Sequence, residues 1–113
     1  MKKHVLRIRG EDKMFFDLIK DGIKTIETRA AVAKYKKIEK SDILVFTCGN
    51  STVEKRVIEK YWFSSIDEMI KHLDLKKIMP HLNTEDEAMR VWHNFPDYKS
   101  KIAKYELMAW ELG

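Results

Sequence analysis

A short segment around Gly22 marks the point where this chain changes from one kind of secondary structure to another. Apolar side chains recur at helical spacing between residues 14 and 19, and Asp12 stands before them as the expected N-cap. A glycine suits the position after a helix, where the backbone takes a positive φ. Residues 23–29 then alternate and are rich in Ile and Thr, which is typical of a strand. The chain is therefore expected to leave a helix at Gly22 and to enter a strand.

Three charged side chains, Lys24, Glu27 and Arg29, lie within this boundary segment. Strict strand alternation would place Glu27 and Arg29 on one face with Thr25, and Lys24 on the other. The lysine can therefore join the other two only if residues 22–25 are irregular. If the three converge, the arginine offers a planar fork for a phosphate or a base edge, and the carboxylate orients the cations. The alternative is a glycine cap followed by a solvated, charged strand face.

The pattern Gly22-x-Lys24-x-x-Glu27-x-Arg29 resembles the G-x-K-x-x-E-x-R signature of the ASCH domain family, which is related to the RNA-binding PUA fold. A strand and a helix before the motif, and a last strand over residues 105–112, extend the resemblance over nearly the whole chain. It implies an α+β fold: a small PUA-like β-barrel with an N-terminal helix and a helical insert before the last strand. It also implies that the motif lines a cleft and that the partner is RNA or a nucleotide.

The composition indicates one soluble globular domain over residues 1–113. Hydrophobic residues make up 44% of the chain and charged residues 35%, and the length allows a single core. No apolar stretch is long enough to span a bilayer, and residues 1–4 lead directly into a strand without a signal-type core. We therefore expect a cytoplasmic protein with no membrane partner. Cys48 has no second cysteine to pair with and is expected to be a small buried hydrophobe.

A net charge of +4 permits nucleic-acid binding without demanding it. The position of the charges matters more than their sum. If the fold gathers the basic clusters around one cleft, they form a groove that follows a phosphate backbone; otherwise they are solvated lysines scattered over the surface. These clusters comprise Lys34, Lys36, Lys37 and Lys40, then Lys55, Arg56 and Lys60, and finally Lys99, Lys101 and Lys104.

Hydrophobic patterning predicts the remaining strands. Residues 4–9 are expected to form a first strand, residues 30–40 a loop with a short strand around Tyr35, and residues 42–48 a central strand that is apolar on both faces. The pair at positions 49 and 50 is expected to form a two-residue hairpin turn. Residues 51–63 fit helical spacing, but they are β-branched and aromatic and follow that turn. We interpret them as a strand that is bulged near Arg56.

Helical signals dominate residues 65–95. Ser65 begins a capping box, a second short helix over residues 75–82 is interrupted at Pro80, and a third opens at Thr84. This insert is expected to cover one opening of the barrel. The residues expected to be largely buried are those of the apolar stripes and the central strand: Phe15, Leu18, Ile19, Leu44, Phe46, Ile66, Ile70, Met89 and Trp92.

No dense cluster of Cys, His and carboxylate residues predicts a metal site, and no glycine-rich phosphate loop or nucleophile elbow is found, so no cofactor is expected. The segment 92–98 combines aromatic and polar residues. Trp92 and Phe95 are expected in the core, which leaves His93 and Tyr98 as candidates for the cleft. The predicted ligand-binding residues are therefore Gly22, Lys24, Thr25, Glu27, Arg29, His93 and Tyr98.

Two functions remain open at this stage. The first is an RNA- or nucleotide-binding module that uses the basic cleft; a protein partner also stays open. The second is a small hydrolase acting on a modified nucleoside or RNA, because some small ASCH proteins resemble hydrolases that use a lysine and a threonine of this motif. Lys24 matches that lysine, but Glu27 occupies the threonine position. A glutamate cannot serve as the same hydroxyl nucleophile.

Overall fold

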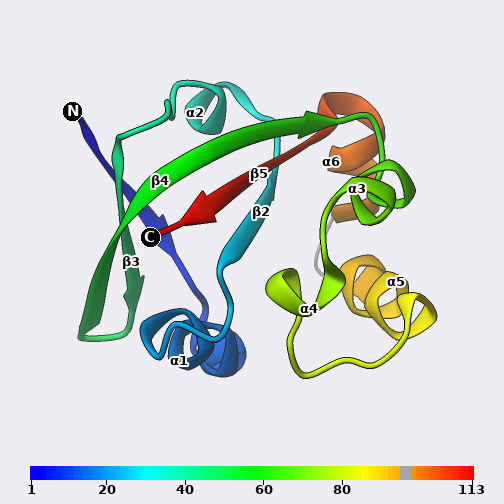
Figure 1. Ribbon diagram of the computed structural model, residues 1–113, viewed down its shortest axis with the longest axis horizontal. Coiled ribbons are helices and arrows are strands. Elements are labelled where there is room, and N and C mark those ends of the chain that lie inside the picture. Colours follow the sequence, from blue (N-terminus) through cyan, green and yellow to red (C-terminus); the bar gives the residue numbers. More distant parts are fainter. Residues whose placement is uncertain (95–97) are drawn as a thin grey trace.

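The chain forms a curved sheet with helices at both sides, an α+β fold with the shape of a half-barrel (Figure 1). The computed structural model describes residues 1–94 and 98–113 and, for residues 98 and 99, the backbone only. In this part of the chain the sheet has five strands in the order β1-β3-β4-β5-β2. The strands are β1 (Lys3–Arg7), β2 (Ile26–Ala30), β3 (Ile43–Cys48), β4 (Ser51–Phe63) and β5 (Leu107–Leu112). β1 and β3 run parallel, whereas the other neighbours are antiparallel.

The helices occupy both ends of the half-barrel. A 3₁₀ turn (Gly10–Asp12) leads into α1 (Lys13–Lys20), and a single turn, α2 (Ala33–Lys36), follows β2. Four helices between β4 and β5 gather on one side of the sheet, at the right of Figure 1, and form the predicted helical insert. They are α3 (Ile66–His72), α4 (Leu75–Ile78), α5 (Glu85–Asn94) and α6 (Tyr98–Tyr105). No helix in the described part of the chain is both long and apolar enough to cross a membrane.

β4 joins the two halves of the sheet because it is long enough to pair with different neighbours along its length. Its first half pairs with β3, and its second half pairs with β5 after a register shift between Val57 and Glu59. The prediction of a strand here, rather than a helix, is confirmed. So is a bulge close to Arg56, and a bulge of this kind bends a strand and increases its twist. The hairpin turn is also confirmed, since Cys48 pairs with Ser51 and Gly49 has a φ of 59°.

The sheet separates two hydrophobic clusters. One face packs on α1 through Leu6, Phe16, Ile19, Phe46 and Trp110. The other face packs on the helical insert through residues that include Ile66, Met69, Trp92, Leu107 and Ala109. β5 contributes alternate residues to both clusters, so its side chains are buried on both faces of the sheet. The sequence assigned that property to residues 42–48, but in β3 only alternate side chains are fully buried.

The core predictions are confirmed for Ile19, Leu44, Phe46, Ile66 and Trp92. Phe15, Leu18, Ile70 and Met89 are only partly buried. In α1 the buried aromatic residue is Phe16, because the face of the helix that packs on the sheet is rotated by one position from the predicted stripe, which leaves Met14 exposed. Phe95 lies outside the described residues.

Several local predictions differ from the structure. Asp12 occupies the N-cap position of α1, but its carboxylate accepts from Arg9 Nε at 2.8 Å and caps no backbone N–H. Tyr35 lies in a helical turn rather than in a short strand, and its ring packs edge-on against Trp110. α6 fills a segment that the sequence left without structure and extends to Tyr105, which was expected to begin the last strand; that strand, β5, begins at Leu107. Ser65 caps α3 as predicted, since its Oγ accepts from the Glu68 backbone N–H at 3.1 Å.

Replacing Phe46 by Ala tests the packing of the first cluster. Phe46 is fully buried, so its loss is expected to lower the free energy of unfolding by about 3–5 kcal/mol, measured by chemical denaturation. Val5→Ala on the neighbouring strand β1 is the control, because Val5 is exposed and its loss should change stability by less than about 0.5 kcal/mol. Equal, small effects of both substitutions would contradict this description of the core.

Candidate functional site

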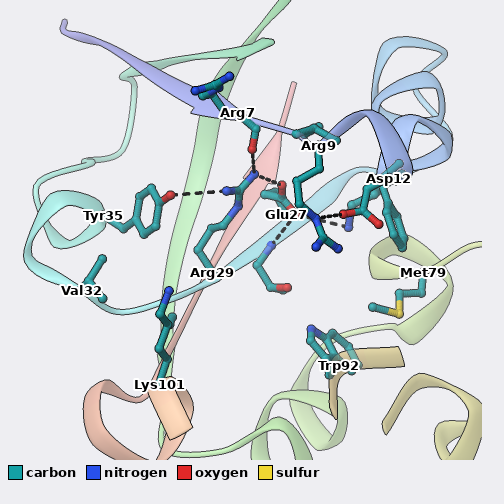
Figure 2. A pocket seen from close by; sticks show the side chains of 15 residues that line it. Arg7, Arg9, Asp12, Glu27, Arg29, Val32, Tyr35, Met79, Trp92 and Lys101 are labelled. Carbon is teal, nitrogen blue, oxygen red and sulfur yellow. Dashed lines mark hydrogen bonds and ion pairs between the residues drawn. The ribbon is translucent and has the colours of Figure 1, made fainter. Parts of the chain in front are cut away.

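A cavity of about 340 Å³ lies where the half-barrel is left open between its two edge strands, β1 and β2 (Figure 2). One wall consists of the end of β1 and the residues after it, and a second is β2 itself. The helical insert closes the third side through Met79, Trp92 and Lys101. The volume is within the range of pockets that hold small ligands, which begins at roughly 300 Å³. The cavity therefore touches both the sheet and the insert.

Lys24 reaches this cavity because the backbone between α1 and β2 is irregular. Gly22 has a φ of 75°, and the backbone N–H groups of Ile23 and Lys24 both donate to the carbonyl of Leu18 at 3.0 Å. The predicted role of Gly22 as the residue that ends the helix is thus confirmed. Strand geometry begins only at Ile26. The condition under which Lys24 could join Glu27 and Arg29 is met, and all three side chains line the cavity.

The three charged residues of the motif form a buried chain of ion pairs. Glu27 is the central member: its Oε1 lies 3.7 Å from Lys24 Nζ and its Oε2 lies 3.2 Å from Arg29 Nη2. Only 4% of the Lys24 side chain, 10% of Glu27 and 19% of Arg29 is exposed. Glu27 Oε1 also accepts from the backbone N–H of Thr28 at 2.9 Å. The alternative of a solvated charged strand face does not fit this burial.

Burial and charge pairing act in opposite directions on the carboxyl group of Glu27. Burial by itself would raise the pKa of Glu27, but Arg29, Lys24 and the Thr28 N–H outweigh it and hold the pKa below its ordinary value. Burial lowers the pKa of Lys24, and Glu27 opposes that shift. Each charge is therefore tolerated only in the presence of its partner.

Arg29 connects the two open edges of the half-barrel. Its Nη2 donates to the carbonyl oxygen of Arg7 at the end of β1 at 3.1 Å, and its Nη1 donates to the hydroxyl of Tyr35 at 3.4 Å. Figure 2 shows the guanidinium between Tyr35, Arg7 and Glu27. The Arg29 side chain thus links β1 and β2, the two edge strands whose pairing would have closed the barrel. The gap below this bridge is the cavity.

The ammonium group of Lys24 is held by backbone carbonyls and by an ion pair. It donates to the carbonyl oxygens of Ile26, at 2.7 Å, and Ile78. Its Nζ also lies 3.7 Å from Glu27 Oε1, an ion-pair distance. Because Ile78 ends α4, this lysine fastens the helical insert to the start of β2. The arrangement gives Lys24 a positioning role.

The rim of the cavity carries further positive charge. Arg7, Arg9 and Lys101 are exposed and come from segments far apart in the sequence. Asp12 lies among them and is paired with Arg9 Nε at 2.8 Å. Of the described lining residues, five are cationic and two anionic, and both carboxylates already contact a cation. The site therefore presents excess positive charge to whatever occupies it.

A second cavity, of about 270 Å³, lies next to the first and shares Arg9, Asp12 and Phe15 with it. His81 lines it, with its ring 5.3 Å from the ring of Phe15. Partial burial, with a smaller effect from the charge of Lys24, lowers the pKa of His81 below its ordinary value. The two cavities form neighbouring compartments on the same side of α1.

The structure places the other predicted site residues differently. Gly22 and Thr25 shape the approach to β2 and are not among the lining residues, and the backbone N–H of Thr25 donates to the carbonyl of Lys77 at 2.9 Å. His93 is exposed on α5 and does not line either cavity, because α5 turns Trp92 toward the site instead. Tyr98 begins α6, and its side chain lies outside the described residues.

Several lining residues were not among the predicted site residues. The alternation of Arg7 and Arg9 at the end of the first strand is a signal that could have indicated a basic face at a strand end. Lys101 belongs to one of the basic clusters that the sequence could place at the cleft only conditionally, and Tyr35 gave no such signal, since the fold brings it to β2. Within the described residues, no three His, Cys, Asp or Glu side chains are grouped as metal ligands would be.

Comparison with known proteins gives structural relatives only. No protein-family model matches the chain, and no curated protein matches its sequence significantly. The crystal structure of hypothetical protein PH0355 is similar with a TM-score of 0.83 and 26% identity, over 99% of this chain and 97% of that one. The solution structure of protein PF0455 from Pyrococcus furiosus is similar with a TM-score of 0.74 and 26% identity, over 97% and 94% of the two chains. The fold is thus shared with these proteins over nearly its full length.

Replacing Lys24 by Met tests the buried chain. The substitution keeps the length of the side chain but leaves the carboxylate of Glu27 with one partner fewer and the Ile78 carbonyl without its donor. We expect the free energy of unfolding to fall by about 3–5 kcal/mol, measured by chemical denaturation at pH 7. Lys20→Met is the matched control, since Lys20 is exposed at the end of α1. Equal stabilities of the two variants would refute the structural role of Lys24.

The depressed pKa of Glu27 makes stability depend on acid pH. A carboxyl group whose folded pKa is lowered stabilises the fold above its unfolded pKa, near 4.5, and this contribution is lost as pH falls through the folded pKa. We expect Glu27→Gln to be less stable at pH 7 and to lose less stability than the wild type between pH 5 and the acid limit, as followed by urea denaturation at several pH values. Parallel curves for the two proteins would contradict the pairing.

Proposed function

We propose that the protein binds a nucleotide or a short single-stranded RNA in the cavity between β1, β2 and the helical insert. The observation that carries this proposal is the composition of the lining: five cationic side chains beside two already paired carboxylates, together with three aromatic rings. Phosphate groups are recognised by arginine and lysine, and bases stack on aromatic side chains. One cavity provides both kinds of group.

The cationic side chains are placed so that they can act on a ligand in two ways. Lys24 and Arg29 belong to the buried chain and fix the shape of the wall. Arg7, Arg9 and Lys101 stand at the exposed rim, where a phosphate could stay partly hydrated. A phosphate at the rim would place the rest of the ligand toward the interior of the cavity.

The aromatic lining consists of Phe15, Tyr35 and Trp92. Tyr35 is fixed by its hydroxyl, which accepts from Arg29, and by its edge-on contact with Trp110. Trp92 is buried in the helical insert, so only a small part of it reaches the cavity. Rigid rings of this kind favour a flat ligand without a large loss of side-chain freedom.

The resemblance to the ASCH domain family agrees with this proposal. Lys24, Glu27 and Arg29, the charged residues of the motif, all lie in the cavity wall. We accordingly propose that the half-barrel is of the PUA-like kind and that the protein acts in RNA processing or regulation in the cytoplasm. The contacts of Lys24 favour a structural over a catalytic role, because its Nζ donates to two backbone carbonyls and is paired with Glu27.

Lys101→Ala tests the binding function. Lys101 is exposed, lines the cavity and makes no hydrogen bond or ion pair with the described residues, so its loss should leave the fold intact. We expect weaker binding of a labelled single-stranded RNA, measured by fluorescence anisotropy, and a plot of log affinity against log salt that is flatter by about 0.7 for one lost phosphate contact. Lys71→Ala, exposed on α3 and away from both cavities, is the matched control.

A product assay on acylated and other modified nucleosides, run beside the binding assay, separates the two functions. A binding module gives salt-dependent affinity and no turnover. Turnover by the wild-type protein in the absence of RNA binding at low salt would overturn the proposal in favour of the hydrolase. Identical RNA affinity of the Lys101→Ala and Lys71→Ala variants would show that RNA binds elsewhere.

A further inference from the structure

The free edge of β2 forms one wall of the cavity, and its backbone groups can be assigned from the strand pairing. Among the described residues, β2 is the last strand of the sheet and has β5 as its only neighbouring strand. The carbonyl of Thr25 accepts from Leu112 at 2.8 Å, and the N–H of Ala31 donates to Glu106 at 3.0 Å. In an antiparallel pair, residues that bond the neighbour alternate with residues that do not. The backbone groups of Thr28 and Ala30 therefore point away from β5.

Most of the outward-pointing groups are already capped by the protein. Lys24 Nζ donates to the carbonyl of Ile26, and Glu27 Oε1 accepts from the N–H of Thr28. The N–H of Val32 donates to the carbonyl of Ala30 at 2.8 Å. Between these caps remain the carbonyl of Thr28 and the N–H of Ala30, for which the described part of the chain provides no hydrogen-bond partner.

The two residues that carry these groups are buried and line the cavity. Thr28 is 7% exposed and Ala30 5% exposed. Buried backbone donors and acceptors are nearly always paired with protein, water or a ligand. The strand edge thus offers one hydrogen-bond acceptor and, two residues on, one donor. A ligand in the cavity could bond both.

We propose that this pair reads the base of the bound nucleotide. The inference rests on the proposed function and names the part of the site that would hold the base. The Thr28 carbonyl would accept from a donor on the ring, and the Ala30 N–H would donate to an adjacent ring acceptor. Adenine and cytosine have an amino group beside a ring nitrogen, whereas guanine and uracil have a ring N–H beside a carbonyl, so the edge of each base offers such a pair.

The capping of β2 argues against an added peptide strand as the occupant. Strand addition requires a run of alternating free groups along the edge. Here Lys24 and Glu27 already hold the Ile26 carbonyl and the Thr28 N–H, and a turn ends the edge at Val32. Between these caps, the described part of the edge leaves a two-point contact. A planar heterocycle matches that contact and also suits the aromatic lining.

Ala30→Pro tests the inference, because it removes the backbone N–H without changing a charge. Proline is tolerated on an edge strand where the N–H points outward, and the preceding Arg29 is already extended. We expect Ala30→Pro to weaken AMP and CMP by about tenfold, as expected for one lost hydrogen bond, and to leave ribose 5-phosphate within about twofold. Lys101→Ala should instead weaken all three ligands. Isothermal titration calorimetry measures the affinities.

Amide NMR keeps the inference testable if the proline variant does not fold. On titration of the wild-type protein, AMP should shift the ¹H–¹⁵N signal of Ala30 strongly, and ribose 5-phosphate should shift it little. If nucleotides bind but neither move that signal nor respond to Ala30→Pro, base reading at β2 is wrong while nucleotide binding stands. If no nucleotide or RNA binds, the proposed function fails as well. A larger Ala30 shift with an extended peptide would overturn the inference in favour of strand addition.

Discussion

The buried chain of Lys24, Glu27 and Arg29 is the interaction on which the rest of this structure depends. Glu27 holds both cations in place, and each cation then bonds a carbonyl of another element: Lys24 reaches Ile78 at the end of α4, and Arg29 reaches Arg7 at the end of β1. One carboxylate thereby links the helical insert, β2 and the opposite edge of the half-barrel. Removing Glu27 would leave both cations without their carboxylate, and removing either cation would leave Glu27 with one partner fewer.

Two of these residues, Lys24 and Glu27, also protect the unpaired edge of β2. An exposed edge strand invites pairing with other chains, and proteins protect such edges with charged side chains or covering elements. In β2 the protection is specific to individual atoms: the ammonium of Lys24 covers the Ile26 carbonyl and the carboxylate of Glu27 covers the Thr28 N–H. A motif read from the sequence as ligand-binding charge therefore also has a structural role. The uncovered stretch of the edge is the one that faces the cavity.

The sequence predicted the features that depend on neighbouring residues and missed those that depend on the fold. Gly22, the hairpin at Gly49 and the cap at Ser65 are local, and each was placed correctly. The helical spacing of α1 did not fix which residues face the sheet to within one position. Phe15 was therefore expected to be buried, whereas the buried residue is Phe16. Lys101 could not be assigned to the site, because α6 was not predicted and only the sheet order brings it beside β2.

The charges of the site fall into two electrostatic environments, and this separation has a physical consequence. Salt screens exposed charges strongly and buried pairs much less. The ion pairs of Glu27 are buried, so the stability they provide should change little with ionic strength. Arg7 and Lys101 stand in water at the rim, where attraction for a phosphate weakens as salt rises. The wall of the cavity should therefore keep its shape as salt rises. If the site binds a phosphate, as proposed, its affinity should fall with salt while the stability of the fold changes little.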